Sequence, residues 1–137
     1  MTNLNTIDNK ISQIRKYLLR AKSYLPNSRQ EIETDDRIRD SLERVLYLIT
    51  QASIDLGDIV ISYRKLRKPG NQSEIFQIIH EHDIISRELM EKLISMTGFR
   101  NVIAHDYAKI NYDRVYEVLH KDLQDIEEFS DIISNLK

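Results

Sequence analysis

The stretch RIRDSLERVLYLITQASIDLGDIVISY, from Arg37 to Tyr63, indicates the fold more directly than any other part of the chain. Apolar residues recur along it every three or four positions, which is the spacing of one face of an α-helix. This face consists of Ile38, Leu42, Val45, Leu46, Ile49, Ala52, Leu56, Ile59, Val60 and Tyr63. A stripe this broad can pack against two helices at once. The stretch therefore predicts a long helix within a helical bundle.

A further helix is expected on the N-terminal side of this stretch. We predict that Thr6 caps its beginning and that Pro26 stops it, because a hydroxyl accepts from free backbone amides and proline cannot continue a helix. The apolar face of this helix consists of Ile7, Ile11, Ile14, Leu18, Ala21 and Leu25. The polar residues 27–36 then connect it to the long helix.

Three more helices are expected on the C-terminal side. The Pro-Gly pair at 69–70 ends the long helix, and Ser73 is then expected to cap a short helix that ends near Glu81. Ser86 is expected to cap a fourth helix and Asn111 a fifth. The apolar positions of these last two helices are Leu89, Leu93, Met96 and Phe99 in the fourth, and Val115, Leu119, Leu123, Ile126, Phe129 and Ile133 in the fifth.

Composition agrees with an all-α chain of one domain, residues 1–137. The chain has 137 residues, of which 41% are apolar and 31% charged, with only three glycines and two prolines. Strand-rich domains of this size need more turn residues. With short connections, the helices predict an up-and-down four-helix bundle with one extra short helix. Their wide apolar stripes favour a homodimer, in which a second copy covers the remaining apolar face.

The chain is expected to be cytoplasmic. It has no cysteine, which excludes disulfides and thiolate metal sites and suits a reducing compartment. Its N-terminus, MTNLNTIDNK, has no signal-peptide pattern, and we expect no membrane span because no apolar run approaches about 20 residues. The formal net charge of -2 gives no overall attraction to nucleic acid, so local patches decide such binding.

The segment GFRNVIAHDY, Gly98 to Tyr107, near the end of the fourth helix, gathers Arg, Asn, His, Asp and Tyr within ten residues. On an ideal helix Asn101 and His105 lie on one side, whereas Arg100 and His105 are about 140° apart. Arg100 and His105 can therefore act on one ligand only if the helix unwinds near His105 or if two subunits combine their residues.

These side chains suit metal-independent cleavage of RNA. An imidazole can take up and release a proton near neutral pH, and a guanidinium can hold a phosphate through two hydrogen bonds. In this reaction the ribose 2′-hydroxyl attacks its own phosphate, while one group removes its proton and another protonates the departing 5′-oxygen. A dimer axis that brings two copies of His105 to one phosphodiester would supply both groups, with Arg100 stabilising the growing charge.

A purely structural reading is also available. An Arg-x-x-x-x-His spacing arises easily by chance in a chain with this much arginine and four histidines. A histidine near a helix C-terminus interacts favourably with the helix dipole, and a tyrosine such as Tyr107 can pack with only its hydroxyl in water.

The complete string Arg100-Asn101-x-x-x-His105-x-Tyr107 resembles the HEPN superfamily, and specifically its HepT-type toxins. The similarity extends to ELMEKLISMTGF before the motif, to Ile110-Asn111-x-x-x-Val115-Tyr116 after it, and to Leu123-x-x-Ile126-x-x-Phe129 near the C-terminus. The resemblance implies a homodimeric ribonuclease toxin with Arg100 and His105 as the catalytic pair. It also implies that Asn101 orients a catalytic group or contacts phosphate.

The resemblance also implies a partner. Toxins of this type are paired with an MNT-type nucleotidyltransferase antitoxin that transfers AMP from ATP to the motif tyrosine, here Tyr107. The chain itself then needs no cofactor, since the antitoxin uses the ATP, and no DNA partner is expected. Nucleotide phosphates added two positions from His105 would repel the RNA backbone and compete for Arg100.

Other polar residues carry weaker expectations. Lys109 is a candidate for phosphate contact. The basic cluster of Arg64, Lys65, Arg67 and Lys68 is either an RNA contact or a solvated helix end. No metal site is expected, because His80 and His82 lack a third convergent ligand. Asp106 orients His105 only if the helix has already ended there.

Two alternatives to the ribonuclease remain at the level of sequence. One is a catalytically inactive helical module that docks a small nucleotidyltransferase and helps to form its substrate site. The other is an antitoxin-like or scaffold protein whose polar cluster merely closes a helix. The ribonuclease is favoured because a docking bundle has no chemical need for the complete set of Arg100, Asn101, His105 and Tyr107.

Overall fold

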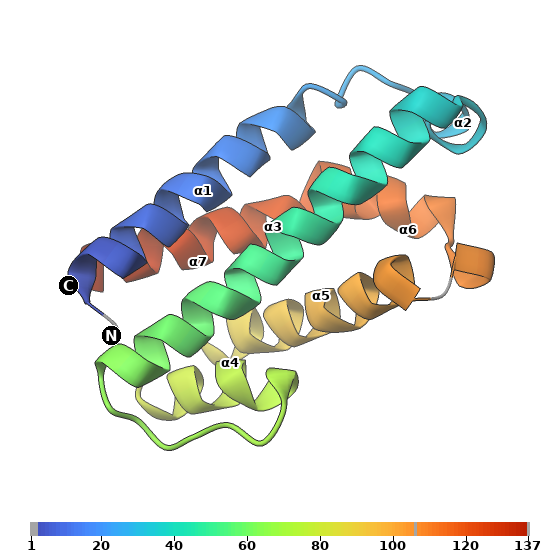
Figure 1. The fold of residues 1–137 in the computed structure, drawn as a ribbon. Coiled ribbons are helices and arrows are strands. Elements are labelled where there is room, and N and C mark those ends of the chain that lie inside the picture. The colour runs from blue at the N-terminus through green and yellow to red at the C-terminus, as the bar shows by residue number, and fades with distance from the viewer. Residues whose placement is uncertain (1–2, 106, 137) are drawn as a thin grey trace.

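Four long helices form an up-and-down bundle in the computed structural model, which describes residues 3–105 and 107–136 (Figure 1). They are α1 (Leu4–Lys22), α3 (Asp36–Tyr63), α5 (Arg87–His105) and α7 (Leu123–Leu136). The shorter elements are α2 (Arg29–Thr34), α4 (Gln72–Glu81), the 3₁₀ turn η1 (Tyr107–Lys109), α6 (Tyr112–Glu117) and the π-helical segment η2 (Val118–Asp122). No strand occurs in the described ranges. The all-α bundle is confirmed.

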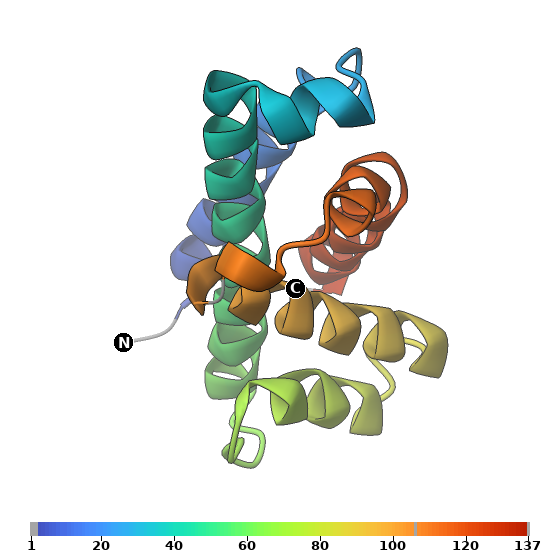
Figure 2. The same cartoon turned by 90° about the vertical axis from the view of Figure 1, so that its right-hand side faces the viewer.

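The long helix α3 organises the core. It packs against α1, α2, α4, α5 and α7, and in Figure 2 it stands upright with α4, α5 and α7 to its right. Leu42, Leu46, Ile49 and Leu56 are fully buried along it. The broad apolar stripe of α3 thus packs against several helices.

By length and composition α3 could also cross a membrane, because an apolar window within its 28 residues has a mean hydropathy of 1.4. The sequence reading did not recognise that part of α3 is apolar enough to meet this criterion. However, 61% of this window is buried inside the bundle. The apolar side chains of α3 are those of a core helix.

Two of the four predicted helix caps are correct. Ser86 Oγ accepts from the Leu89 amide at 3.1 Å, and Asn111 caps α6. The caps of α1 and α4 were placed wrongly on Thr6 and Ser73. Each of these helices is capped by an asparagine two or three positions earlier, Asn3 and Asn71. An asparagine side chain accepts from the free amides of the first turn as well as a hydroxyl does.

The connection between α1 and α3 contains a helix that the sequence reading missed. Helix α2 begins with a capping box, in which Ser28 and Glu31 each accept from the other's backbone amide. Its Ile32 is fully buried. Leu25, expected in the core, is instead 39% exposed, because α1 ends at Lys22 and turns before reaching it.

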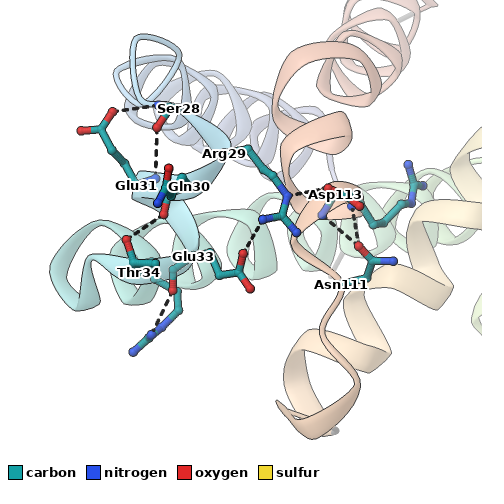
Figure 3. A network of polar contacts seen from close by, with 10 residues as sticks. Ser28, Arg29, Gln30, Glu31, Glu33, Thr34, Asn111 and Asp113 are labelled. Carbon is teal, nitrogen blue, oxygen red and sulfur yellow. Dashed lines mark hydrogen bonds and ion pairs between the residues drawn. The ribbon is translucent and has the colours of Figure 1, made fainter.

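Helix α2 is joined to the segment that follows the polar motif. Figure 3 shows Arg29 reaching from α2 between Glu33 and Asp113, with which it forms ion pairs. The amide of Asp113 donates to Asn111 Oδ1 at 2.9 Å in the same view. These contacts fix the beginning of α6, and with it the return of the chain after α5.

The contact between α3 and α4 provides a stability prediction. A Cβ at Gly57 would lie 2.6 Å from Ile75 Cγ2 and 3.3 Å from Ile79 Cδ1, so side chains of α4 already fill the space that a side chain at Gly57 would need. We expect Gly57→Ala to lower the free energy of unfolding by about 1–3 kcal/mol, because overpacking outweighs the gain in helix propensity. Denaturant unfolding measures the change.

Gly98 on α5 is the matched control, since a Cβ there would meet nothing within 4 Å. Gly98→Ala should raise the free energy of unfolding by about 0.5–1 kcal/mol, the usual helical preference for alanine. Equal effects of the two substitutions would show that the close contact of α3 and α4 does not limit stability.

Candidate active site

The polar motif occupies the last two turns of α5, which remains helical as far as His105. Arg100 is half-buried, whereas the side chains of Asn101 and His105 are exposed. The helix therefore does not unwind before His105. Asp106 lies outside the described residues, as does the side chain of Tyr107, so the predictions for these two groups stay predictions. The backbone of Tyr107 begins η1, two positions after the last residue of α5.

Arg100 is held against α3 by Tyr47. Its Nη2 donates to Tyr47 Oη at 3.3 Å, and its Cζ lies 5.1 Å from the centre of the tyrosine ring. Its Nη1 donates to Asn101 Oδ1 at 2.9 Å, which agrees with an orienting role for Asn101. Its Nε is buried and has no acceptor among the described residues. Among the described residues, Arg100 is thus held by an aromatic ring and neutral acceptors and pairs with no carboxylate.

A cavity of about 370 Å³ lies between α3 and α5 beside this contact. Its lining consists of Asp40, Glu43, Arg44, Tyr47, Ile103, Ala104 and His105. His105 and the tyrosine that holds Arg100 therefore face the same space. Arg100 and His105 project from different sides of α5. Tyr47 of α3 holds Arg100 and lines the cavity that His105 also lines.

The carboxylates of this cavity are already engaged. Asp40 Oδ1 accepts from Arg39 Nε at 3.2 Å. Glu43, only 8% exposed, accepts from the Tyr112 hydroxyl at 2.9 Å. Burial raises the pKa of Glu43, and burial together with the hydrogen bond to Glu43 raises the pKa of Tyr112 to about 12. The remaining ionisable side chains of the lining are Arg44 and His105, and the positive charge of Arg44 suits an anion.

Glu43 provides a pH-dependent prediction. Because its pKa is raised in the folded state, its contribution to stability is complete at acidic pH and is lost as pH rises through the folded pKa. Glu43→Gln removes this titration while keeping an acceptor for Tyr112. We expect the variant to gain roughly 1 kcal/mol or less over the native chain at neutral pH and nothing near pH ~3, below the ordinary glutamate pKa. Thermal unfolding at both pH values tests this, and a pH-independent difference would contradict it.

Lys109 lies in a different place. It is exposed and lines a separate cavity of about 240 Å³, with Phe99, Ile110 and Arg114 among its other lining residues. The structure therefore does not bring it into the cavity of His105. Its contact with phosphate remains a prediction.

Half of the basic cluster after α3 is occupied by structural contacts. Arg67 forms ion pairs with Glu74 at 2.9 Å and Glu81 at 2.8 Å, and Arg64 Nη2 donates to the Leu136 carbonyl at 3.3 Å. These contacts hold the loop between α3 and α4 and the end of α7. In the histidine pair, His80 Nδ1 lies 2.9 Å from the Ile85 carbonyl oxygen.

Sequence reasoning missed the half of the site that α3 supplies. Asp40, Glu43, Arg44 and Tyr47 lie between the buried positions of a helix that was interpreted by its apolar residues alone. Tyr47 and Arg100 are 53 positions apart, and no local pattern joins them. The one available signal was the presence of polar and aromatic residues within an otherwise apolar helix.

Comparison with known proteins identifies the relatives of this chain. The family model for ribonuclease HepT-like proteins matches residues 14–133. The mRNA nuclease HepT of Shewanella oneidensis is 29% identical over 127 residues, which cover 93% of this chain and 95% of that protein. The tRNA nuclease HepT of Aphanizomenon flos-aquae is 30% identical over 131 residues, which cover 90% of this chain and 86% of that protein.

A solved structure is also closely similar. The tri-AMPylated Shewanella oneidensis HEPN toxin, in complex with its MNT antitoxin, superposes with a TM-score of 0.86 at 28% identity. The match covers 94% of this chain and 96% of that one. The fold and the sequence similarity therefore point to the same group of proteins.

Proposed function

Since this chain belongs to the ribonuclease HepT-like family and is a ribonuclease, we propose that it is the toxin of a HEPN/MNT toxin-antitoxin system. It acts as a metal-independent RNA endonuclease in the cytoplasm, with Arg100 and His105 as its catalytic residues. The observation that carries this assignment is that His105 and Tyr47, the residue that holds Arg100, line the same cavity. His105 lines the cavity between α3 and α5, and Arg100, which pairs with no carboxylate in the described ranges, is fixed on the tyrosine of that cavity.

The proposed reaction is transesterification within the RNA strand. The ribose 2′-oxygen attacks the adjacent phosphorus as a base takes up its proton, and the bond from phosphorus to the 5′-oxygen breaks as an acid protonates that oxygen. The products are a 2′,3′-cyclic phosphate and a free 5′-hydroxyl. Arg100 stabilises the negative charge on the phosphoryl oxygens as it increases. Asn101 orients Arg100, and Lys109 contacts a more distant phosphate.

The base and the acid are two copies of His105, brought together by a homodimer. One imidazole cannot begin the step both unprotonated and protonated, so a single chain lacks one of the two groups. His105 is exposed at the end of α5, where a second copy can approach it. The native dimer thus forms one pooled site.

A mixed dimer of native and mutant chains distinguishes a pooled active site, shared by both subunits, from two independent active sites. Native chains and His105→Ala chains carrying different affinity tags are co-expressed, and the mixed dimer is purified through both tags. A pooled site predicts a loss of about 10²-fold or more, whereas independent sites retain about half of the native rate. The control is a native dimer carrying the same two tags.

The proposed partner is an MNT-type nucleotidyltransferase antitoxin. It transfers AMP from ATP onto the Tyr107 hydroxyl, forming a phosphodiester to tyrosine and releasing pyrophosphate. The tri-AMPylated state of the Shewanella toxin in its antitoxin complex supports this assignment. So does the position of Tyr107, two residues after His105, the last residue of α5. The added phosphates lie close to His105 and oppose an RNA backbone by charge and by bulk.

A further inference from the structure

Two guanidinium groups share one phenol ring beside the catalytic histidine. Arg44 Cζ lies 5.5 Å from the centre of the Tyr47 ring, and Arg100 Cζ lies 5.1 Å from the same point. Arg44 comes from α3, three positions before Tyr47, and Arg100 comes from α5. One aromatic ring thus places two positive charges from two helices at the edge of one cavity.

The charge of Arg44 is not neutralised by the carboxylates around it. Asp40, one helical turn before it, is paired with Arg39. Glu43 is buried and accepts from Tyr112. Within the part of the chain that the structure describes, the contact of Arg44 is the ring of Tyr47, and its side chain is exposed and lines the cavity that also contains His105.

Other arginines of the described chain form ion pairs with carboxylates. Arg29, Arg67 and Arg114 each contact two carboxylates. A chain with a formal charge of -2 has enough carboxylates to pair its arginines. Within the described ranges Arg44 and Arg100 instead contact one shared ring and no carboxylate, and planar guanidinium groups bind phosphate through two hydrogen bonds.

We propose that Arg44 binds a phosphate of the RNA strand next to the one that is cleaved, and that Tyr47 positions Arg44 and Arg100 on neighbouring phosphates. The assignment rests on the proposed ribonuclease function and extends the RNA site from the α5 motif onto α3. Arg44 binds the RNA strand, whereas Arg100 and His105 act on the phosphate that is cleaved. A single strand bound in this way releases counterions from each phosphate that a cation neutralises.

The salt dependence of RNA binding tests this proposal. A fluorescein-labelled single-stranded RNA of mixed sequence is titrated with His105→Ala protein at several salt concentrations, so that binding is measured without cleavage. Adding Arg44→Gln should reduce the slope of log K against log salt by about 0.7, the value for one phosphate contact on a single strand. Arg44→Lys should leave the slope almost unchanged, because counterion release depends on the charge.

Arg20 supplies the matched control. It is exposed, its Cζ lies 5.7 Å from the Tyr17 ring on α1, and it lines no part of the His105 cavity. Arg20→Gln removes the same charge from the same kind of aromatic contact and should leave the slope unchanged. Thermal unfolding establishes that all the variants are folded.

Equal slopes for Arg44→Gln and Arg20→Gln would overturn the proposal. An unchanged RNA slope together with weaker binding of the antitoxin would also overturn it, since Arg44 would then serve the protein partner. Neither result affects the ribonuclease assignment, which is tested separately by cleavage with the native chain.

Discussion

His105→Ala is expected to reduce RNA cleavage by about 10³-fold or more, because it removes the group that transfers protons at both oxygens of the reacting phosphate. The side chain is exposed at the end of α5, so its loss should change the free energy of unfolding by no more than about 0.5 kcal/mol. The measurement is the initial rate of cleavage of a labelled RNA, with thermal unfolding on the same samples.

His82→Ala is the matched control for this variant. His82 is an exposed histidine at the C-terminal end of α4, just as His105 is at the end of α5. Its removal should leave the cleavage rate unchanged. If His105→Ala retained more than a tenth or so of the native rate, proton transfer by His105 could not account for the reaction.

Tyr107→Phe is expected to separate toxicity from its control by the antitoxin. Loss of the hydroxyl removes the acceptor of AMP, so mass spectrometry should find no adduct after incubation with the antitoxin and ATP. The variant should still cleave RNA, and the antitoxin with ATP should no longer lower its rate, whereas it should lower the native rate by about 10²-fold or more by charge and bulk.

Tyr63→Phe controls for the loss of an exposed tyrosine hydroxyl elsewhere. Tyr63 is 40% exposed at the end of α3. Its substitution should leave both the AMP adduct on Tyr107 and the inhibition by the antitoxin intact. An AMP adduct on the Tyr107→Phe protein would place the modification on another residue. Loss of cleavage by the unmodified variant would assign Tyr107 to the reaction itself.

The long helices were predictable because their identity depends on buried apolar faces. The positions named on the fourth and fifth helices are all buried, as are most of those on the first. The ends of helices were less predictable, since neighbouring residues such as Asn3 and Thr6 offer equivalent acceptors and only the backbone geometry decides between them. Helix α2 was missed because six residues with one buried side chain, Ile32, are too short to show a period.

The candidate site was predictable only on α5. The motif from Arg100 to Tyr107 is contiguous, so its residue types and spacing could be recognised. The contribution of α3 could not, because Tyr47 meets Arg100 only through the packing of two helices that are distant in sequence. That same packing places Tyr47, which holds Arg100, in the lining of the cavity that His105 also lines. Arg100 and His105 remain on different sides of an unbroken helix and are related through the ring and the cavity beside it.

Metal-independent catalysis by Arg100 and His105 can be tested by cleavage of RNA in excess EDTA, using dimeric protein purified without antitoxin and the same protein after treatment with antitoxin and ATP. We expect cleavage by the untreated protein, with 2′,3′-cyclic phosphate ends, and its loss once AMP is attached to Tyr107. A folded, unmodified dimer that leaves RNA intact in EDTA would contradict metal-independent catalysis by Arg100 and His105. The motif would then serve to dock a nucleotidyltransferase.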